Sequence, residues 1–470
     1  MRNSIIIFQV LLLLCVPAGC SLAPEYTRPE TTVPDTWPEG DAYDGETAAE
    51  HSNALPVLKW KDHFPDERLQ RIVETALESN RDFRIAALKV ERARAMYGIQ
   101  RAELFPAVNA AGSYARERVP KDFSPTGESM TTEQYSVSLG ATAWELDFFG
   151  RVRNLEDKAL EEYGAMEQAH RAAAVILASE VASVWFALAA DRENLDLAKR
   201  VLETRENSLG LIRSRYENGV ASELDLQRAR TQVETARGDV ALFTRRLAQD
   251  ENAISLLAGT RVLPDLLPSG LNSVDPPVEV SPGLSSEVLL SRPDVLAAEH
   301  RLKAAHANIG AARASFFPRI TLTSSIGTAS GDLSGLFGSG SETWNFVPRI
   351  TIPIFDRRIR PAYEVTKVER EMAVAEYEKA IQSAFREVAD ALADWSTLER
   401  RVAAQEALVE AAAETFRISE ARYNDGIDSY LSVLDAQRSL YVAQQGLISL
   451  RLEQLVNQVN LYKALGGWTE

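Results

Sequence analysis

The sequence predicts a mainly α-helical fold with added β-structure. We expect long antiparallel helices of coiled-coil type, and four strands per chain that contribute to a transmembrane β-barrel shared among several chains. Three observations support this class: an internal repeat, a seven-residue hydrophobic period, and two pairs of segments in which apolar and polar residues alternate. We therefore expect one architecture that occurs twice in the chain.

The internal repeat extends over most of the chain. Residues 79–106 resemble residues 291–318, with matching residues 212 positions apart. Further on, the turns RYENG and RYNDG begin at positions 215 and 422, which are 207 apart. The spacing falls from 212 to 207 because the second copy is five residues shorter than the first in the region between these matches. This difference in length marks a loop, and the rest of the repeat is continuous.

Each copy contains a long stretch in which a hydrophobic residue recurs every seven positions. This register holds over residues 174–216 and 374–423. Because no proline interrupts 154–216 or 362–423, each is predicted to be one helix of about 95 Å at 1.5 Å per residue. Such helices are far longer than those of an ordinary globular domain.

Glycines are expected to end the long helices, Gly219 in the first copy and Gly426 in the second. A return helix follows over residues 222–258 and is too short to match the long helix. We expect it to stack end to end with the helix at 293–316, which begins at a proline.

Alternating segments predict two strands in each copy, at about 106–119 and 134–147 and at about 318–328 and 342–355. In the second strand, the odd-numbered residues from Tyr135 to Ala143 are expected to share one apolar face. Flanking aromatic residues favour a membrane barrel. Composition alone also allows a soluble sheet.

Four strands cannot close a barrel, and an open sheet edge has no hydrogen-bond partners in lipid. The chain is therefore expected to oligomerise. Two chains would supply eight strands and a filled interior, whereas three would supply twelve strands with room for an aqueous lumen. If the barrel conducts, three is the smaller adequate number.

The N-terminus is typical of a signal peptide, with a short apolar run and small residues before Cys20. This pattern resembles a bacterial lipobox and predicts a covalent lipid on Cys20; ordinary secretory cleavage is the alternative. Cys15 is the only other cysteine, so the mature body would have no thiol for a disulfide or a metal. Past the leader there is no uncharged run of roughly 18 apolar residues. The nearest candidate, Ala172–Ala190, carries Glu180 and is expected to be a buried helix face and not a transmembrane helix.

Composition narrows the possible functions. The net charge of −16 and a pI near 5.0 argue against nucleic acid as a partner. The five histidines are expected at the surface, since the spacing of His300 and His306 does not fit a metal-binding helix. We expect no catalytic residue, no metal site and no cofactor besides the lipid on Cys20, and hence no enzyme.

Several motifs together resemble the TolC-like outer-membrane factor family, in particular its OprM-like lipoprotein branch that serves drug-efflux pumps. They are GCSLAPEYTRP, SRPDVLAAEHRL, SFFPRITL, VLDAQRSLY, LYKALGGW and the paired RY..G turns. The resemblance implies a lipid-anchored homotrimer in the outer membrane, with a trimeric transmembrane β-barrel. It implies further that the long helices form an α-barrel, which is the periplasmic helical extension. It also implies a periplasmic adaptor and an inner-membrane efflux pump, expected to be proton-driven.

These inferences predict five regions of the chain. They are a signal peptide at 1–19, a lipidated extended segment at 20–65, a first repeat at 66–262, a mid-height linker at 263–285 and a second repeat at 286–470.

The two turns gather charged and aromatic side chains at the tip of the helices. Repeated threefold, their carboxylates would form rings that attract cations, and the arginines, including Arg438, would tie the turns together in a closed state. Asp428 and Asp435 are expected to face the lumen, although each charge alone could be a solvated cap. The candidate periplasmic gate residues are Asp225, Asp428, Asp435, Tyr216, Tyr423, Arg215 and Arg422.

The sequence therefore predicts an outer-membrane exit duct for a tripartite efflux system that conducts drugs or other small molecules passively. Two alternatives stay open. One is a periplasmic coiled-coil adaptor or scaffold lipoprotein without a pore, and the other is the exit duct of a protein-secretion system. No lipoyl-like or small β-barrel module is evident in the sequence, which favours the duct.

Overall fold

The computed structural model describes residues 21–43, 59–278 and 285–467. Cys20 and the predicted signal peptide lie outside these residues. The chain divides into two compact units. The first comprises the chain up to Glu30, Lys89–Glu167 and Ala297–Tyr377, and the second comprises Thr31–Leu88, Gln168–Leu296 and Glu378–Glu470.

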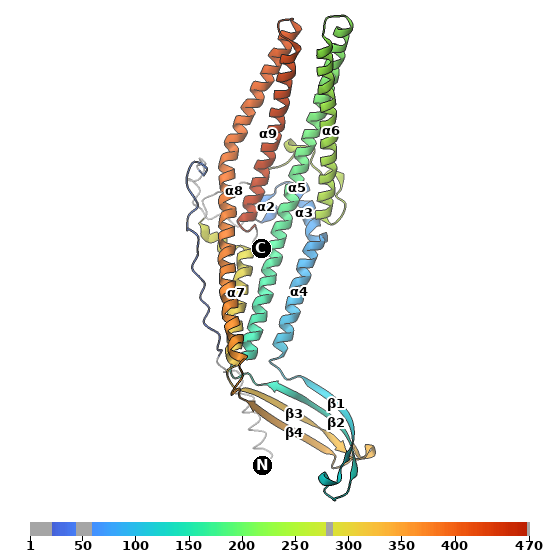
Figure 1. The fold of residues 1–470 in the computed structure, drawn as a ribbon, viewed down its shortest axis with the longest axis vertical. Helices are drawn as coiled ribbons and strands as arrows, with labels where there is room; N and C mark the ends of the chain where they lie inside the picture. The colour runs from blue at the N-terminus through green and yellow to red at the C-terminus, as the bar shows by residue number, and fades with distance from the viewer. Residues whose placement is uncertain (1–20, 44–58, 279–284, 468–470) are drawn as a thin grey trace. The chain divides into compact units, whose positions relative to one another are not determined.

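The order of elements repeats along the chain. A helix, two strands, a long helix and a return helix occur first as α4, β1, β2, α5 and α6, and again as α7, β3, β4, α8 and α9 (Figure 1). The strands are β1 Val108–Val119, β2 Met130–Glu145, β3 Arg319–Ser330 and β4 Glu342–Thr351. The helices are α2 Trp60–His63, α3 Glu67–Ser79, α4 Arg81–Ala102, α5 Arg151–Glu217, α6 Glu223–Ala258, α7 Pro293–Ala314, α8 Ile359–Asn424 and α9 Tyr430–Ala464.

The long helices α5 and α8 have 67 and 66 residues, which corresponds to about 100 Å each. Pro361 lies in the first turn of α8, where its missing N–H removes no helical hydrogen bond. In Figure 1, α6 lies alongside α5 and α9 alongside α8. The expected pair of long helices with return helices is therefore confirmed.

The end-to-end stacking of the short helices differs from the prediction. We expected the return helix at 222–258 to meet the helix at 293–316. Instead, the end of α6 meets the junction of α3 and α4, where Asn80 Nδ2 donates to the Leu257 carbonyl at 2.9 Å. Arg292, just before α7, donates to the carbonyl of Ala464 at the end of α9. The heptad pattern does not predict which short helices stack end to end, because the stacking depends on contacts between helix ends that are distant in sequence.

A hydrophobic core of the second unit surrounds Trp185 of α5. Trp185 is fully buried and its Nε1 donates to the Leu266 carbonyl at 3.1 Å. By composition α5 is apolar enough to cross a membrane, but 61% of its apolar window is buried within the protein. We therefore interpret that stretch as a core helix, as expected from the sequence.

His63 corrects the expectation that the histidines lie at the surface. Its ring is fully buried and stacks on Tyr462, with centroids 4.4 Å apart and an interplanar angle of 10°. Burial lowers the pKa of His63 to about 4. The imidazole is thus a neutral part of the core.

The N-terminal residues 21–43 contain neither helix nor strand and end in a turn, in which the Tyr43 N–H donates to the Gly40 carbonyl. The helix α2 falls within the range 20–65 that we expected to be extended. In the first unit, Arg28 bonds to Glu299 at 2.8 Å, and this carboxylate is nearly buried. In the second unit, Trp37 stacks on Phe385 at 5.0 Å. These contacts attach the segment to α7 and α8 through side chains.

Candidate functional site

The four strands form one antiparallel sheet in the order β1-β2-β3-β4. β1 and β4 are the edge strands, and within the described residues each pairs with one neighbour. β2 begins at Met130, four residues before the predicted start, and β4 ends at Thr351, four residues before the predicted end.

The register divides the sheet into an apolar and a polar face. The apolar face carries large side chains that are widely exposed in the single chain, such as Trp344 at 78%. Its members are Val108, Tyr114, Val137, Leu139, Trp144, Leu322, Ile326, Trp344, Phe346 and Ile350. The polar face carries mostly small hydroxyl, amide and glycine residues: Asn109, Ser113, Ser136, Ser138, Gly140, Thr321, Thr323, Ser325, Gly327, Thr343 and Asn345. This division is typical of a barrel with lipid outside and water inside.

A β-bulge interrupts the alternation that we predicted up to Ala143. The register shifts between Ala141 and Trp144, and Ala143 adopts a positive φ of 52°. Because Ala141 pairs with Ser324 and Trp144 with Leu322, the bulge places Trp144 on the apolar face in place of Ala143. An alanine gives no signal of positive φ in the sequence, so the bulge could not be predicted.

The turns after both long helices have the same backbone geometry. Gly219 and Gly426 each have a φ of 74°. After α5, the Gly219 N–H donates to the Tyr216 carbonyl and the Val220 N–H donates to the Arg215 carbonyl. The same two bonds recur after α8 at positions 207 residues later. Both turns are therefore Schellman caps, which require a left-handed residue at the glycine.

Asp225 lies in the first turn of α6 and forms a capping box with Ser222. The Ser222 hydroxyl lies 2.6 Å from Asp225 Oδ2, and the Asp225 N–H donates to that hydroxyl at 3.1 Å. Asp225 therefore has a structural role in one chain, whatever its role in a gate.

Asp428 and Asp435 each pair with an arginine of their own hairpin. Arg422 Nε donates to Asp428 Oδ2 at 2.6 Å, and this guanidinium lowers the pKa of the Asp428 carboxyl. Arg438 contacts Asp435 at 3.3 Å within α9. The first pair bridges the turn between α8 and α9, whereas the second stays on one helix.

Arg215 and Tyr423 connect the two hairpins near their turns. The guanidinium of Arg215, at the end of α5, lies 4.8 Å from the ring centroid of Tyr423, at the end of α8. Tyr423 in turn lies 5.3 Å from the buried ring of Tyr430. Tyr216 is exposed in the single chain. The structure thus brings Arg215, Tyr423, Arg422 and Asp428 together at the turns.

Arg205 is a residue of this region that sequence reasoning missed. It is buried, its Nη1 donates to the Gln232 carbonyl at 3.0 Å, and its guanidinium lies 5.5 Å from the Tyr441 ring centroid. Burial lowers the pKa of Arg205. The heptad pattern could have identified this residue. Leu202 and Leu209 occupy one apolar heptad position, and Arg205 lies three residues after Leu202, at the second position where a core residue is expected.

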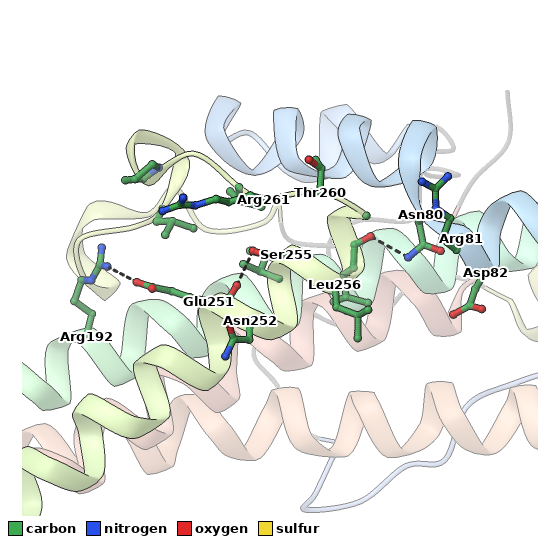
Figure 2. A pocket seen from close by; sticks show the side chains of 16 residues that line it. Asn80, Arg81, Asp82, Arg192, Glu251, Asn252, Ser255, Leu256, Thr260 and Arg261 are labelled. Carbon is green, nitrogen blue, oxygen red and sulfur yellow. Dashed lines mark hydrogen bonds and ion pairs between the residues drawn. The ribbon is translucent and has the colours of Figure 1, made fainter.

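A pocket of about 840 Å³ lies beside the end of α6 in the second unit (Figure 2). In it, Arg192 contacts Glu251 at 3.4 Å and the Ser255 hydroxyl donates to the Glu251 carbonyl at 2.8 Å. Among the described residues, no group of three His, Cys, Asp or Glu side chains is placed to hold a metal ion.

Comparison with known proteins identifies the family. Residues 72–260 and 284–467 match the model described as outer membrane efflux protein. The solvent efflux pump outer membrane protein SrpC of Pseudomonas putida is 46% identical over 466 residues, which cover 99% of this chain and 98% of SrpC. A crystal structure of a membrane protein from Pseudomonas aeruginosa matches with a TM-score of 0.89 and 41% identity, covering 95% of this chain and 98% of that one.

The open state of the Neisseria gonorrhoeae MtrE outer membrane channel also matches, with a TM-score of 0.84 and 37% identity. The match covers 95% of this chain and 98% of MtrE. The chain therefore belongs to the outer membrane efflux protein family.

Proposed function

We propose that three copies of this chain close one barrel and act as the exit duct of a tripartite efflux system in the outer membrane. The observation that carries this proposal is the four-stranded sheet with β1 and β4 as free edges. An open edge is not viable in lipid, so the sheet needs further strands. Three copies of four strands give twelve, which leaves room for a lumen lined by the polar face.

Exposed apolar residues on the helices beside the two edges support this assembly. In the first unit, α4 leads into β1 and exposes Met96 and Ile99, the latter at 69%. α8 follows β4 and exposes Val365, Val368 and Met372, the last at 59%. A neighbouring copy whose β1 pairs with β4 would bring these two stripes toward each other, where each could cover the other.

The turns support contact with a periplasmic adaptor. Directly after each glycine cap stands an exposed apolar residue, Val220 at 76% and Ile427 at 61%. Leu224 and Leu431, one turn further on, are also exposed. Exposed apolar side chains grouped in this way mark interaction sites. We assign them to an adaptor that connects the duct to an inner-membrane pump, expected to be proton-driven.

The first described residues support a lipid anchor on Cys20. The Ser21 hydroxyl donates to Asn154 Oδ1 at 2.9 Å, and Arg313 Nη1 donates to the Leu22 carbonyl at 3.1 Å. These bonds hold the chain immediately after Cys20 within the unit that contains the sheet. Cys20→Ser is expected to remove the acyl mass from the mature protein and to leave the trimer intact. An unchanged mass would contradict lipidation.

The arrangement at the turns supports the proposed gate. The Arg422–Asp428 pair and the Arg215–Tyr423 contact would hold the hairpins in one position, and their release would let the hairpins move. We keep Asp225, Asp435 and Tyr216 as gate candidates, with Asp225 also serving as a helix cap.

Native mass spectrometry of the detergent-solubilised protein tests the assembly. We expect a particle of three chains. Ile99→Glu should dissociate it, because the substitution places a charge on the exposed stripe of α4, whereas Ile99→Leu should leave it intact. A wild-type particle of one or two chains would contradict the proposal and favour a scaffold without a pore.

A further inference from the structure

We propose that Arg349 makes the helix-proximal end of the polar sheet face an anion-attracting belt. Its ligands would be small anions and the carboxylate, sulfonate or phosphate groups of solutes in transit. The inference rests on the proposed function, in which this face lines an aqueous lumen.

The register places Arg349 in a row of three residues across the sheet. Glu145 of β2 pairs with Thr321 of β3, and Thr321 pairs with Arg349 of β4. In the next row, Arg319 pairs with Thr351. Adjacent strands are about 4.8 Å apart, and β3 lies between β2 and β4. The backbones of Glu145 and Arg349 are therefore about 10 Å apart. All of these side chains belong to the polar face.

The carboxylate of this row already has two positive partners. Glu145 forms an ion pair with Arg319, whose Nε lies 2.6 Å from Oε2, and it accepts a hydrogen bond from Arg151 Nη2 at 2.7 Å; its side chain is largely buried. One negative charge therefore serves two guanidinium groups. Glu103 and Asp147 also act electrostatically on Arg151, so this cluster is close to balanced without Arg349, and its carboxylates are already engaged.

Arg349 adds a charge without a counterion. Among the described residues it forms no ion pair, and β4 is exposed along its length. The other carboxylate of the polar face, Glu117, lies near the opposite end of β1. Arg349 is thus free to interact with solutes.

Three copies of this charge would face one another across the proposed lumen. A lumen with low-dielectric walls concentrates the field, and rings of arginine favour anions in pores. The belt would act opposite in sign to the carboxylates at the helix turns. A solute with an anionic group would then have a favourable site at the base of the barrel.

A single cysteine near Arg349 can measure the local potential directly. Thr321→Cys introduces a nearly isosteric thiol on β3, directly opposite Arg349 in the same row of the sheet. The trimer in detergent or vesicles is treated with an anionic and a cationic methanethiosulfonate reagent, and the ratio of the two rates is determined. The chain without the added cysteine provides the background, including any reaction of an unmodified Cys20.

Substitutions at Arg349 in this background give the expected result. Arg349→Gln should lower the anionic-to-cationic rate ratio, by roughly sevenfold for a change of about one kT in potential, and Arg349→Glu should lower it further. Arg349→Lys should preserve the ratio. Arg118→Gln, which removes the same charge from the opposite face, should have no effect.

Two different failures can be told apart. If the Thr321→Cys thiol reacts with both reagents but the ratio is the same in the Arg349 variants, the belt is refuted and the duct is not. If the thiol reacts with neither reagent, the polar face does not line water, and the proposed function falls together with the belt.

Discussion

At the scale of single residues, the pair of Arg422 and Asp428 is the contact that most directly ties a turn. Asp428→Asn removes the charge that Arg422 binds at 2.6 Å, and we expect a higher closed-state leak in planar-bilayer recordings. Glu414→Gln is a matched control, because it disrupts a similar exposed pair with Arg417 within α8. Equal leak in both variants would remove Asp428 from the gate.

His63 gives a prediction on pH. Its pKa is lowered from 6.5 to about 4 in the folded protein, so the unfolded chain binds a proton that the folded chain does not. The neutral His63 ring therefore contributes fully to the free energy of unfolding above about pH 6.5. This contribution is lost as the pH falls toward 4, and the free energy of unfolding then decreases by about 3 kcal/mol in total. His63→Phe keeps an aromatic ring beside Tyr462 and should flatten the acid side of the stability profile, measured by denaturant unfolding. An identical acid slope in the variant would contradict this role.

At the scale of elements, the glycine caps determine where the long helices end. Gly219→Ala places a Cβ in the left-handed region and should destabilise the turn by about 1 kcal/mol. Gly210→Ala provides the control, because it lies within α5, has open space around a Cβ and should stabilise the helix. Hydrogen exchange at residues 215–226 should rise in the first variant alone. Equal exchange in both would argue against the cap.

Much of the fold could be predicted because its signals are local. The heptads and the lack of proline predicted α5 and α8, Gly219 and Gly426 predicted their ends, and the alternating segments predicted four strands. The resemblance to the TolC-like family is confirmed by the family match. The remaining features depend on contacts distant in sequence: the bulge at Ala143, the burial of His63 and the junction of α6 with Asn80. Which gate carboxylates face the lumen depends on other copies of the chain and stays a prediction.

At the scale of the whole molecule, the proposed duct has two opposite charge patterns. Carboxylates at the turns would attract cations, and the Arg349 belt would attract anions. Neither pattern selects one chemical class of drug, so we expect the pump to determine the substrate range. The same architecture would also serve a protein-secretion system, and transport assays with a reconstituted pump would separate the two.

In the proposed assembly, three chains form one water-filled duct. The most direct measurement is single-channel recording of the purified protein in a planar bilayer, with the mass of the same particle determined in parallel. We expect discrete currents from a particle of three chains. A lipid-bound particle of one or two chains that never conducts would contradict it.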